Sequence, residues 1–162
     1  MSMSIQKLTL VKIHHNNLKA FKNLEQSYEA EFSNLTLKMP DENGLFKTEH
    51  EILPNDKYIG YLLYYNQKTP IGFCLVNISD EVKDIAEFYI VPAMRKKKFG
   101  SKLAFMIFNK HPGPWQVRQI NGANHAVNFW RNVIKSYTGN KYNESIVQDD
   151  HWGCVTKQQF VA

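Results

Sequence analysis

The feature that most constrains the fold is a strand-like segment, a proline, a basic run and a glycine, in that order, between residues 85 and 101. Residues 85–91 are rich in β-branched and aromatic side chains, which predicts a strand. Pro92 ends this strand, because proline has no N–H for the hydrogen-bond ladder. The apolar spacing after the basic run predicts a helix from about Lys98 to Asn109. The chain therefore contains a strand that passes through a tight turn into a helix.

The start of this predicted helix is suited to binding an anion. A helix N-terminus carries backbone N–H groups without partners and the positive end of the helix dipole, which together suit a pyrophosphate. Gly100 allows a ligand to approach the backbone closely, and the run Arg95–Lys98 adds cationic side chains. On its own such a run is more typical of a solvated face or a nuclear-import-like patch. Its place between a strand end and a helix start favours phosphate binding.

Apolar periodicity predicts a mixed α/β arrangement for the rest of the chain. The segments 57–65, 71–79 and 85–91 are joined by short loops, which suggests an antiparallel meander. The other predicted strands are 4–13, 115–120, 141–148 and 152–160, and the other predicted helices are 15–38, as one helix or a broken pair, and 124–135.

Composition bounds the class of protein. The 162 residues contain no repeat, low-complexity tract or linker, so one domain spanning residues 1–162 is predicted. Hydrophobic residues make up 43% of the chain, which is too many for a disordered protein. The net charge of +5 is mild. It suits an anionic ligand and does not by itself indicate nucleic-acid binding, which needs basic residues gathered on one face.

The two cysteines, Cys74 and Cys154, each lie in an apolar run, which is typical of reduced core thiols. No cluster of cysteine and histidine has metal-ligand spacing, so no metal site is expected. No stretch has the length and apolarity of a signal peptide or a membrane span. We therefore expect a soluble, cytoplasmic protein that requires no metal.

The segment from Ile90 to Leu103 resembles the signature of the GNAT superfamily, the GCN5-related N-acetyltransferases. That signature is a strand ending in Val-x-Pro, then Arg-x-x-Gly-x-Gly/Ala, then an amphipathic helix. The matching residues are Ile90, Pro92, Arg95, Gly100 and Leu103. The chain departs from the signature at Lys98, where the family usually has glycine. A lysine here can still present its N–H to the phosphates if its φ stays negative, and it adds a charge. The alternative is that its side chain crowds the phosphates.

A second resemblance lies in residues 121–134. GNAT proteins have an Asn-x-x-Ala-x-x-x-Tyr-like helix here, and this chain places Asn124, Ala126 and Trp130 near those positions. The family's tyrosine often protonates the departing CoA thiolate, which the indole N–H of Trp130 cannot do. Tyr137 or Tyr142 is a candidate substitute. The segments 28–33, 44–46, 71–76 and 129–131 are similar to a little-characterised bacterial GNAT subfamily of predicted acetyltransferases.

The resemblance implies a GNAT, or acyl-CoA N-acyltransferase, fold: an α/β (α+β) domain with a mixed, mostly antiparallel sheet flanked by helices. It implies that acetyl-CoA lodges where the strands 85–91 and 115–120 splay apart. The backbone N–H of Ile90 or a neighbour would then polarise the thioester carbonyl. The residues expected to contact acetyl-CoA are Phe88, Tyr89, Ile90, Arg95, Lys96, Lys97, Lys98, Phe99, Gly100, Ser101, Asn124, Asn128 and Trp130.

The resemblance implies that a carboxylate on or near this strand takes the proton of the amine, directly or through water, and Glu87 is the candidate. Some base is required, because an ammonium must lose a proton before it can attack a carbonyl. Strand alternation places Glu87 on one face with Ile85 and Tyr89. An ion pair or an edge charge is the structural alternative for Glu87. In related proteins the helical segment covers the acceptor, so the resemblance implies substrate contacts for Tyr28, Glu31 and Ser33, with packing or capping as the alternative.

The function that these patterns favour is transfer of an acetyl group from acetyl-CoA to a primary amine by direct attack. The acceptor is a small-molecule or peptide amine that the sequence does not identify, and family members are often dimers. The first alternative is a GNAT-fold module that binds acyl-CoA without useful catalysis. The second is a nucleic-acid-binding domain that uses the basic run, which would bind with a steep salt dependence.

Overall fold

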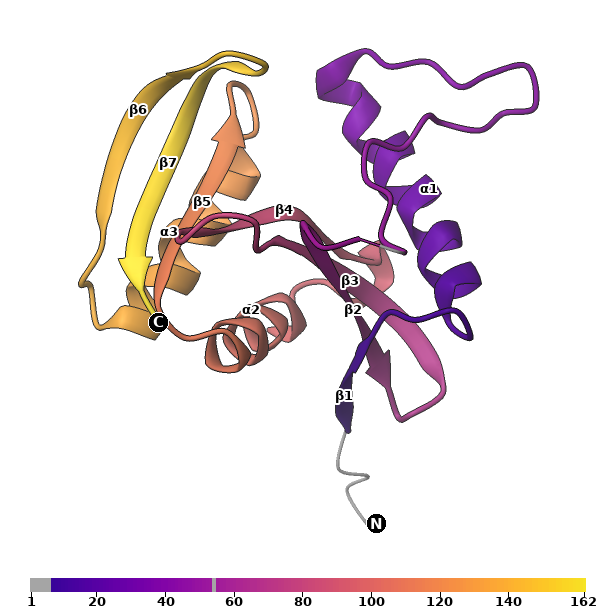
Figure 1. Ribbon diagram of the computed structural model, residues 1–162, viewed down its shortest axis with the longest axis horizontal. Coiled ribbons are helices and arrows are strands. Elements are labelled where there is room, and N and C mark those ends of the chain that lie inside the picture. Colours follow the sequence, from indigo (N-terminus) through magenta and orange to yellow (C-terminus); the bar gives the residue numbers. More distant parts are fainter. Residues whose placement is uncertain (1–6, 54) are drawn as a thin grey trace.

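The computed structural model describes residues 7–53 and 55–162, and they form a seven-stranded sheet with helices on both of its faces (Figure 1). The strand order is β1-β2-β3-β4-β5-β7-β6, and only the β4–β5 pair is parallel. The strands are β1 (Leu8–Lys12), β2 (Tyr58–Tyr65), β3 (Thr69–Asn77), β4 (Lys83–Ile90), β5 (Pro114–Ile120), β6 (Asn143–Asp149) and β7 (Gly153–Val161). The helices are α1 (Leu18–Thr36), α2 (Phe99–Lys110) and α3 (Asn124–Thr138), and a 3-10 turn, η1, spans Pro92–Met94.

The predicted element order and the mixed, mostly antiparallel sheet are confirmed. The segment 15–38 forms one continuous helix, α1, rather than a broken pair. The predicted first strand begins later than expected, at Leu8, and residues 4–6 lie outside the described part of the chain. The expected meander is β2, β3 and β4, each antiparallel to the next.

Two apolar clusters lie on opposite faces of the sheet. Phe21 of α1 packs with Leu62, Phe73 and Tyr89 on one face. The larger cluster, on the other face, joins α2 and α3 to the sheet through residues such as Phe108. Cys74 belongs to this larger cluster, whereas Cys154 is exposed, so the expectation of a core thiol is wrong for Cys154 because its side chain points to solvent from β7. Both thiols are free.

The sheet opens between β4 and β5. These parallel strands pair only at their first residues, where Lys83 lies opposite Trp115 and Asp84 opposite Gln116. Beyond that point β4 continues to Ile90 and β5 to Ile120, and the two strands no longer pair with each other. The expected splay between these strands is therefore present.

A β-bulge in β4 changes which side chains share a face. Leu75 pairs with Glu87 but the next residue, Val76, pairs with Ile85, so Ala86 is an extra residue in β4. Ile85 consequently packs into the cluster with α2 and α3, while Tyr89 packs into the cluster beside α1. The expectation that Glu87 shares a face with both Ile85 and Tyr89 is wrong for Ile85, because the bulge inverts the alternation between them.

Candidate functional site

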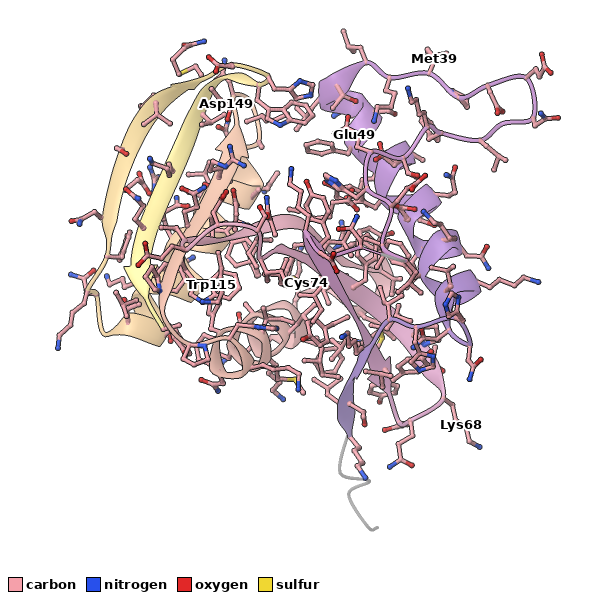
Figure 2. The ribbon with its side chains drawn as sticks, in the orientation of Figure 1. Met39, Glu49, Lys68, Cys74, Trp115 and Asp149 are labelled. Atoms are coloured by element: carbon pink, nitrogen blue, oxygen red, sulfur yellow. The ribbon has the colours of Figure 1, made fainter. Side chains whose placement is uncertain are left out.

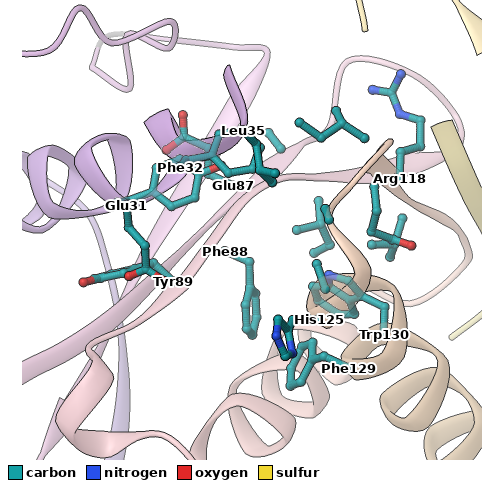
Figure 3. A pocket seen from close by; sticks show the side chains of 18 of the residues that line it. Glu31, Phe32, Leu35, Glu87, Phe88, Tyr89, Arg118, His125, Phe129 and Trp130 are labelled. Carbon is teal, nitrogen blue, oxygen red and sulfur yellow. The ribbon is translucent and has the colours of Figure 1, made fainter. Parts of the chain in front are cut away.

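A cavity of about 1270 Å³ occupies the opening between β4 and β5. Its walls come from α1 on one side of the sheet and from the start of α2 and of α3 on the other (Figure 3). β4 runs along the cavity and carries Glu87, Phe88 and Tyr89 into its wall. The cavity thus has two halves, one on the α2 side and one on the α1 side, with the end of β4 between them.

The α2 half is shaped by a turn whose backbone amides lie at the start of α2. Lys96 and Lys98 adopt left-handed backbone conformations, with φ of 60° and 62°. The condition of a negative φ at Lys98 is therefore not met: the N-cap of α2 is left-handed, and here a lysine adopts that conformation where the family usually has glycine. Alternating right- and left-handed residues direct successive N–H groups into one concave surface, which suits an anion.

The first turn of α2 carries no competing cap. The first helical hydrogen bond runs from Lys102 N–H to Lys98 O, so the N–H groups of Phe99, Gly100 and Ser101 precede the helical ladder. The N-cap residue forms no side-chain capping bond, and the first turn contains no acidic residue. Donors, dipole and charge at this end of α2 all favour a negatively charged ligand.

Gly100 has a packing role that the sequence does not indicate. A Cβ at this position would lie 3.1 and 3.2 Å from two ring carbons of Phe129. The missing side chain therefore lets α2 and α3 approach closely, besides leaving room at the cavity wall. For this reason a bulky substitution at Gly100 would test the α2–α3 contact as much as ligand binding.

Arg95 is held by protein groups rather than left free for a phosphate. Its Nε donates to the carbonyl of Ile90 at 2.8 Å, and its two terminal nitrogens bind both carboxylate oxygens of Glu31 at 2.7 and 2.8 Å. Its guanidinium also lies over the ring of Tyr89, 5.5 Å from the ring centre. Arg95 and Glu31, expected to serve the cofactor and the acceptor separately, form one ion pair at the cavity wall.

The backbone of Ile90 presents its polar groups to the opening. Gly72 and Ile90 face each other, and the neighbouring Val91 N–H donates to Ile71 O at 2.8 Å. In an antiparallel pair the N–H groups of successive residues point to opposite sides. The N–H of Ile90 therefore points away from β3 and toward the side from which β5 has diverged.

Aromatic side chains line the wall between the two halves. Phe88 lies against Trp130 and Phe129, with ring centres 4.8 and 5.6 Å apart. Trp130 is buried in the larger core cluster and also lines the cavity. The two candidate substitutes for the missing family tyrosine lie elsewhere. The hydroxyl of Tyr137 donates to Asn109 at 2.8 Å, and Tyr142 lines a separate small hollow beside β6 and β7.

The α1 half is centred on Glu87, which is buried at the cavity wall. Its Oε1 lies 3.6 Å from Nε2 of His50, and its Oε2 is buried without a hydrogen-bond partner. Burial, with the nearby carboxylates of Glu25 and Glu29, raises the pKa of Glu87 to about 8. Burial also lowers the pKa of His50, so this imidazole is a weak source of positive charge.

Further carboxylates surround this site. Glu25 is fully buried and binds Lys22 at 2.9 Å, and burial raises its pKa. Glu29 is buried and accepts a hydrogen bond from Lys38. Burial and then the charge of Glu87 raise the pKa of the Tyr28 hydroxyl, which therefore stays neutral. The α1 half thus concentrates carboxyl groups where the α2 half concentrates N–H donors.

Most residues expected at the site line the cavity, and three do not. Those in its wall are Tyr28, Glu31, Glu87, Phe88, Tyr89, Ile90, Arg95, Lys96, Lys98, Phe99, Gly100, Ser101, Asn124 and Trp130. Ser33, Lys97 and Asn128 lie outside it. Ser33 donates to the carbonyl of Ala30 at 2.6 Å, and the ammonium of Lys97 contacts the sulfur of Met94 at 3.8 Å.

The sequence reasoning missed Glu29, Glu49, His50 and Lys38, all of which line the cavity. The sequence does contain a signal for Glu29. Glu25 and Glu29 lie four residues apart and fall in phase with Phe21, on the face of α1 that packs on the sheet. Charged residues on a buried helix face are rare unless they are paired or functional. The other three lie in or beside the loop after α1, where no periodicity identifies them.

Within residues 7–53 and 55–162, no group of three or more histidine, cysteine, aspartate or glutamate side chains is arranged to hold a metal ion. No helix in the same ranges is both long enough and apolar enough to cross a membrane.

Comparison with known proteins identifies the fold. No protein-family model matches the sequence, and no curated protein matches it either. Among solved structures, it is similar to spermidine N-acetyltransferase from Vibrio cholerae in complex with CoA and spermine, with a TM-score of 0.65 and 12% identity over 95% of both chains. It is also similar to ribosomal-protein-S18-alanine N-acetyltransferase from Escherichia coli, with a TM-score of 0.63 and 9% identity over 96% of this chain and 94% of that one. The GNAT fold expected from the sequence motif is confirmed.

Proposed function

We propose that the chain is an acetyl-CoA-dependent N-acetyltransferase that transfers an acetyl group to a primary amine by direct attack. One observation carries the proposal: a single cavity joins a helix N-terminus suited to phosphate with a buried carboxyl group suited to an amine. The two solved neighbours are N-acetyltransferases, and one is in complex with CoA, which supports the same chemistry.

The residues of the α2 half fit the phosphates of acetyl-CoA. The N–H groups of Phe99, Gly100 and Ser101 would donate to the pyrophosphate, and Lys96 and Lys98 would add charge. The aromatic wall of Phe88 and Trp130 offers the pantetheine arm an apolar surface along β4. The N–H of Ile90 would donate to the thioester oxygen, where negative charge grows as the amine attacks.

Glu87 would take the proton of the amine. The amine nitrogen forms a bond to the thioester carbon, the carbon–sulfur bond breaks, CoA leaves as the thiolate, and the proton released from nitrogen passes to the Glu87 carboxylate directly or through water. With a pKa of about 8, Glu87 is largely protonated at neutral pH in the free protein. An ammonium bound beside it would favour the charged carboxylate and lower that pKa.

The second candidate is a module that binds acyl-CoA without turnover. The observation that favours it is that neither candidate substitute for the family tyrosine, Tyr137 or Tyr142, lines the cavity. A thiol-release assay distinguishes the two candidates. Wild type and Glu87→Gln are mixed with acetyl-CoA and a panel of primary amines, free CoA is followed with a thiol reagent, and the acetylated amine is identified by mass.

We expect wild type to release CoA in an amine-dependent reaction and Glu87→Gln to do so far more slowly. If acetyl-CoA binds but no amine in the panel causes release of CoA, the non-catalytic binding module is supported. Failure of wild type to bind acetyl-CoA would contradict both candidates.

A further inference from the structure

An ammonium group of the chain itself occupies a cage of oxygen atoms in the α1 half of the cavity. Lys38 Nζ lies 3.0 Å from Glu29 Oε2, 3.3 Å from the carbonyl oxygen of Lys47 and 3.4 Å from Glu49 Oε1. An ammonium has three N–H donors and no acceptor, so three oxygens around it match its chemistry. We call Glu29, Glu49 and the Lys47 carbonyl the ammonium cage.

The position of Lys38 follows from the end of α1. Leu37 adopts a left-handed conformation with φ of 58°, and its N–H closes the helix on Ser33 O. The chain then leaves the helix and returns alongside it as the loop that carries Glu49 (Figure 2). Lys38 thus reaches back to α1, and the cage is built from one helical residue and two loop residues.

The cage is open to the cavity. Glu29 is buried, with 5% of its side chain exposed, whereas Lys38 and Glu49 are 25% and 37% exposed. All three side chains line the same cavity as Glu87. A ligand in the cavity can therefore reach the oxygens that Lys38 now contacts, without any rearrangement of the sheet.

The same half of the cavity has a second place for an amino group. Glu87 Oε2 is buried without a hydrogen-bond partner, and Glu87 points from β4 into the cavity wall (Figure 3). A buried carboxyl oxygen without a donor is costly and is usually satisfied by a ligand or by water. The ammonium cage and Glu87 Oε2 thus both need N–H donors, and the chain supplies an ammonium only to the cage.

We propose that the ammonium cage is a binding subsite for a primary ammonium, that Lys38 fills it when no acceptor is bound, and that the acceptor is a linear molecule with two amino groups. One amino group would lie at Glu87, and the other would displace the Lys38 ammonium from the cage. This inference rests on the proposed function, since it names the substrate class of the same site. A monoamine could occupy only one of the two places at a time, so the second amino group supplies the selectivity.

Calorimetry without acetyl-CoA tests the subsite directly. Wild type, Lys38→Met, Glu49→Gln and Lys47→Met are each titrated with a series of α,ω-diamines and with the monoamine of equal chain length. Lys38→Met keeps most of the length of the unbranched side chain and removes its ammonium. Lys47→Met is the matched control, because Lys47 contributes only its backbone carbonyl and its side chain is exposed.

We expect wild type to bind the best diamine more tightly than its monoamine. Lys38→Met vacates the cage and should raise diamine affinity by about tenfold, a charge-assisted hydrogen-bond effect of roughly 1.4 kcal/mol, and should raise monoamine affinity less, because a monoamine makes only one of the two contacts. Glu49→Gln should lower diamine affinity only, and Lys47→Met should change neither. The optimal diamine length reports the distance between the cage and Glu87.

If the ratio of diamine affinity to monoamine affinity is the same in wild type and in Lys38→Met, the inference is overturned. If Lys38→Met does not fold, an unchanged ratio in Glu49→Gln would overturn it in the same way. Titration of the same proteins with acetyl-CoA distinguishes failure of the subsite from failure of the proposed function. Normal acetyl-CoA binding with an unchanged amine ratio removes only the subsite, whereas loss of acetyl-CoA binding in wild type removes the proposed function as well.

Discussion

The two halves of the cavity present opposite polarity by different means. On the α2 side the backbone presents donors, through the N–H groups of Phe99 to Ser101 and two left-handed lysines. On the α1 side the side chains present acceptors, with Glu87, Glu29 and Glu49 in the wall. A backbone site depends on local chain geometry, whereas a side-chain site depends on elements far apart in the sequence. One opening in a sheet therefore holds a positive and a negative site within reach of each other.

Arg95 is the one group that belongs to both halves. It follows the turn after β4, yet its guanidinium binds Glu31 of α1 in a bidentate ion pair. That pair lies at the cavity wall and links the turn after β4 to α1. Substitutions in the α1 half, in the α2 half and in the Arg95–Glu31 pair test whether the two halves have separate roles.

The largest expected effect comes from removing the base of the α1 half. Glu87→Gln keeps the shape of the side chain and removes proton acceptance, so we expect turnover to fall by about 10²–10⁴-fold with acetyl-CoA affinity nearly unchanged. Because only the deprotonated carboxylate accepts a proton, wild-type kcat/KM, which reports the free enzyme, should rise with pH up to about 8 and then level off. Steady-state rates from pH 6 to 9 check both points. A Glu87→Gln variant with the same rate and the same pH profile would remove Glu87 from the chemistry.

The same variant should change how stability depends on pH. The pKa of Glu87 is raised to about 8 from an ordinary value of 4.5, so the native state holds this proton more tightly than the unfolded state does. Its contribution to stability is fully present below pH 4.5 and is lost as pH rises toward 8. Urea unfolding should therefore show Glu87→Gln gaining a few kcal/mol over wild type between pH 5 and pH 9, at about 1.4 kcal/mol per unit of pKa shift. Parallel curves for the two proteins would show that Glu87 is not desolvated as described.

A smaller effect is expected from the link between the halves. Glu31→Gln weakens the ion pair and frees Arg95 for phosphate, so acetyl-CoA affinity should rise about threefold to tenfold. Arg95→Ala should lower that affinity, and the double variant should behave like Arg95→Ala alone. Calorimetry on the three proteins provides the comparison. An identical gain for Glu31→Gln in the presence and absence of Arg95 would show that the pair does not compete with phosphate.

The smallest expected effect concerns backbone strain in the α2 half. Lys98 has a φ of 62°, a conformation that costs a residue with a Cβ about 1 kcal/mol. Lys98→Gly should therefore raise the free energy of unfolding by about 1 kcal/mol relative to Lys98→Ala, since both variants lose the charge and only glycine relieves the strain. Chemical denaturation of the pair measures this difference. Equal stability of the glycine and alanine variants would mean that the turn is not strained.

The sequence predicted the α2 half better than the α1 half, for a physical reason. The strand, Pro92, the basic run and Gly100 are adjacent in the chain, so their order alone predicts a phosphate turn. What it did not predict is the left-handed φ of Lys98, because lysine gives no local sign of a conformation that usually marks glycine.

The α1 half needed contacts that only the fold creates. The bulge at Ala86 separates Ile85 from Glu87, and alanine carries no bulge signal. The ammonium cage joins Glu29 to a loop residue twenty positions later, and neither position predicts the other. Phase along α1 places Glu25 and Glu29 on a buried face, and that was the local clue to the carboxyl groups around Glu87.

Titration with acetyl-CoA is the most direct test of the account, with Ser101→Ala and Ser101→Pro as a matched pair. Proline is tolerated in the first turn of a helix, so Ser101→Pro removes one backbone donor of the phosphate site while Ser101→Ala removes only a hydroxyl. We expect saturable binding by wild type, similar binding by Ser101→Ala, and affinity about tenfold lower for Ser101→Pro, as for loss of one charge-assisted hydrogen bond. Absence of binding by wild type, or equal binding by all three proteins, would contradict a phosphate site at the start of α2.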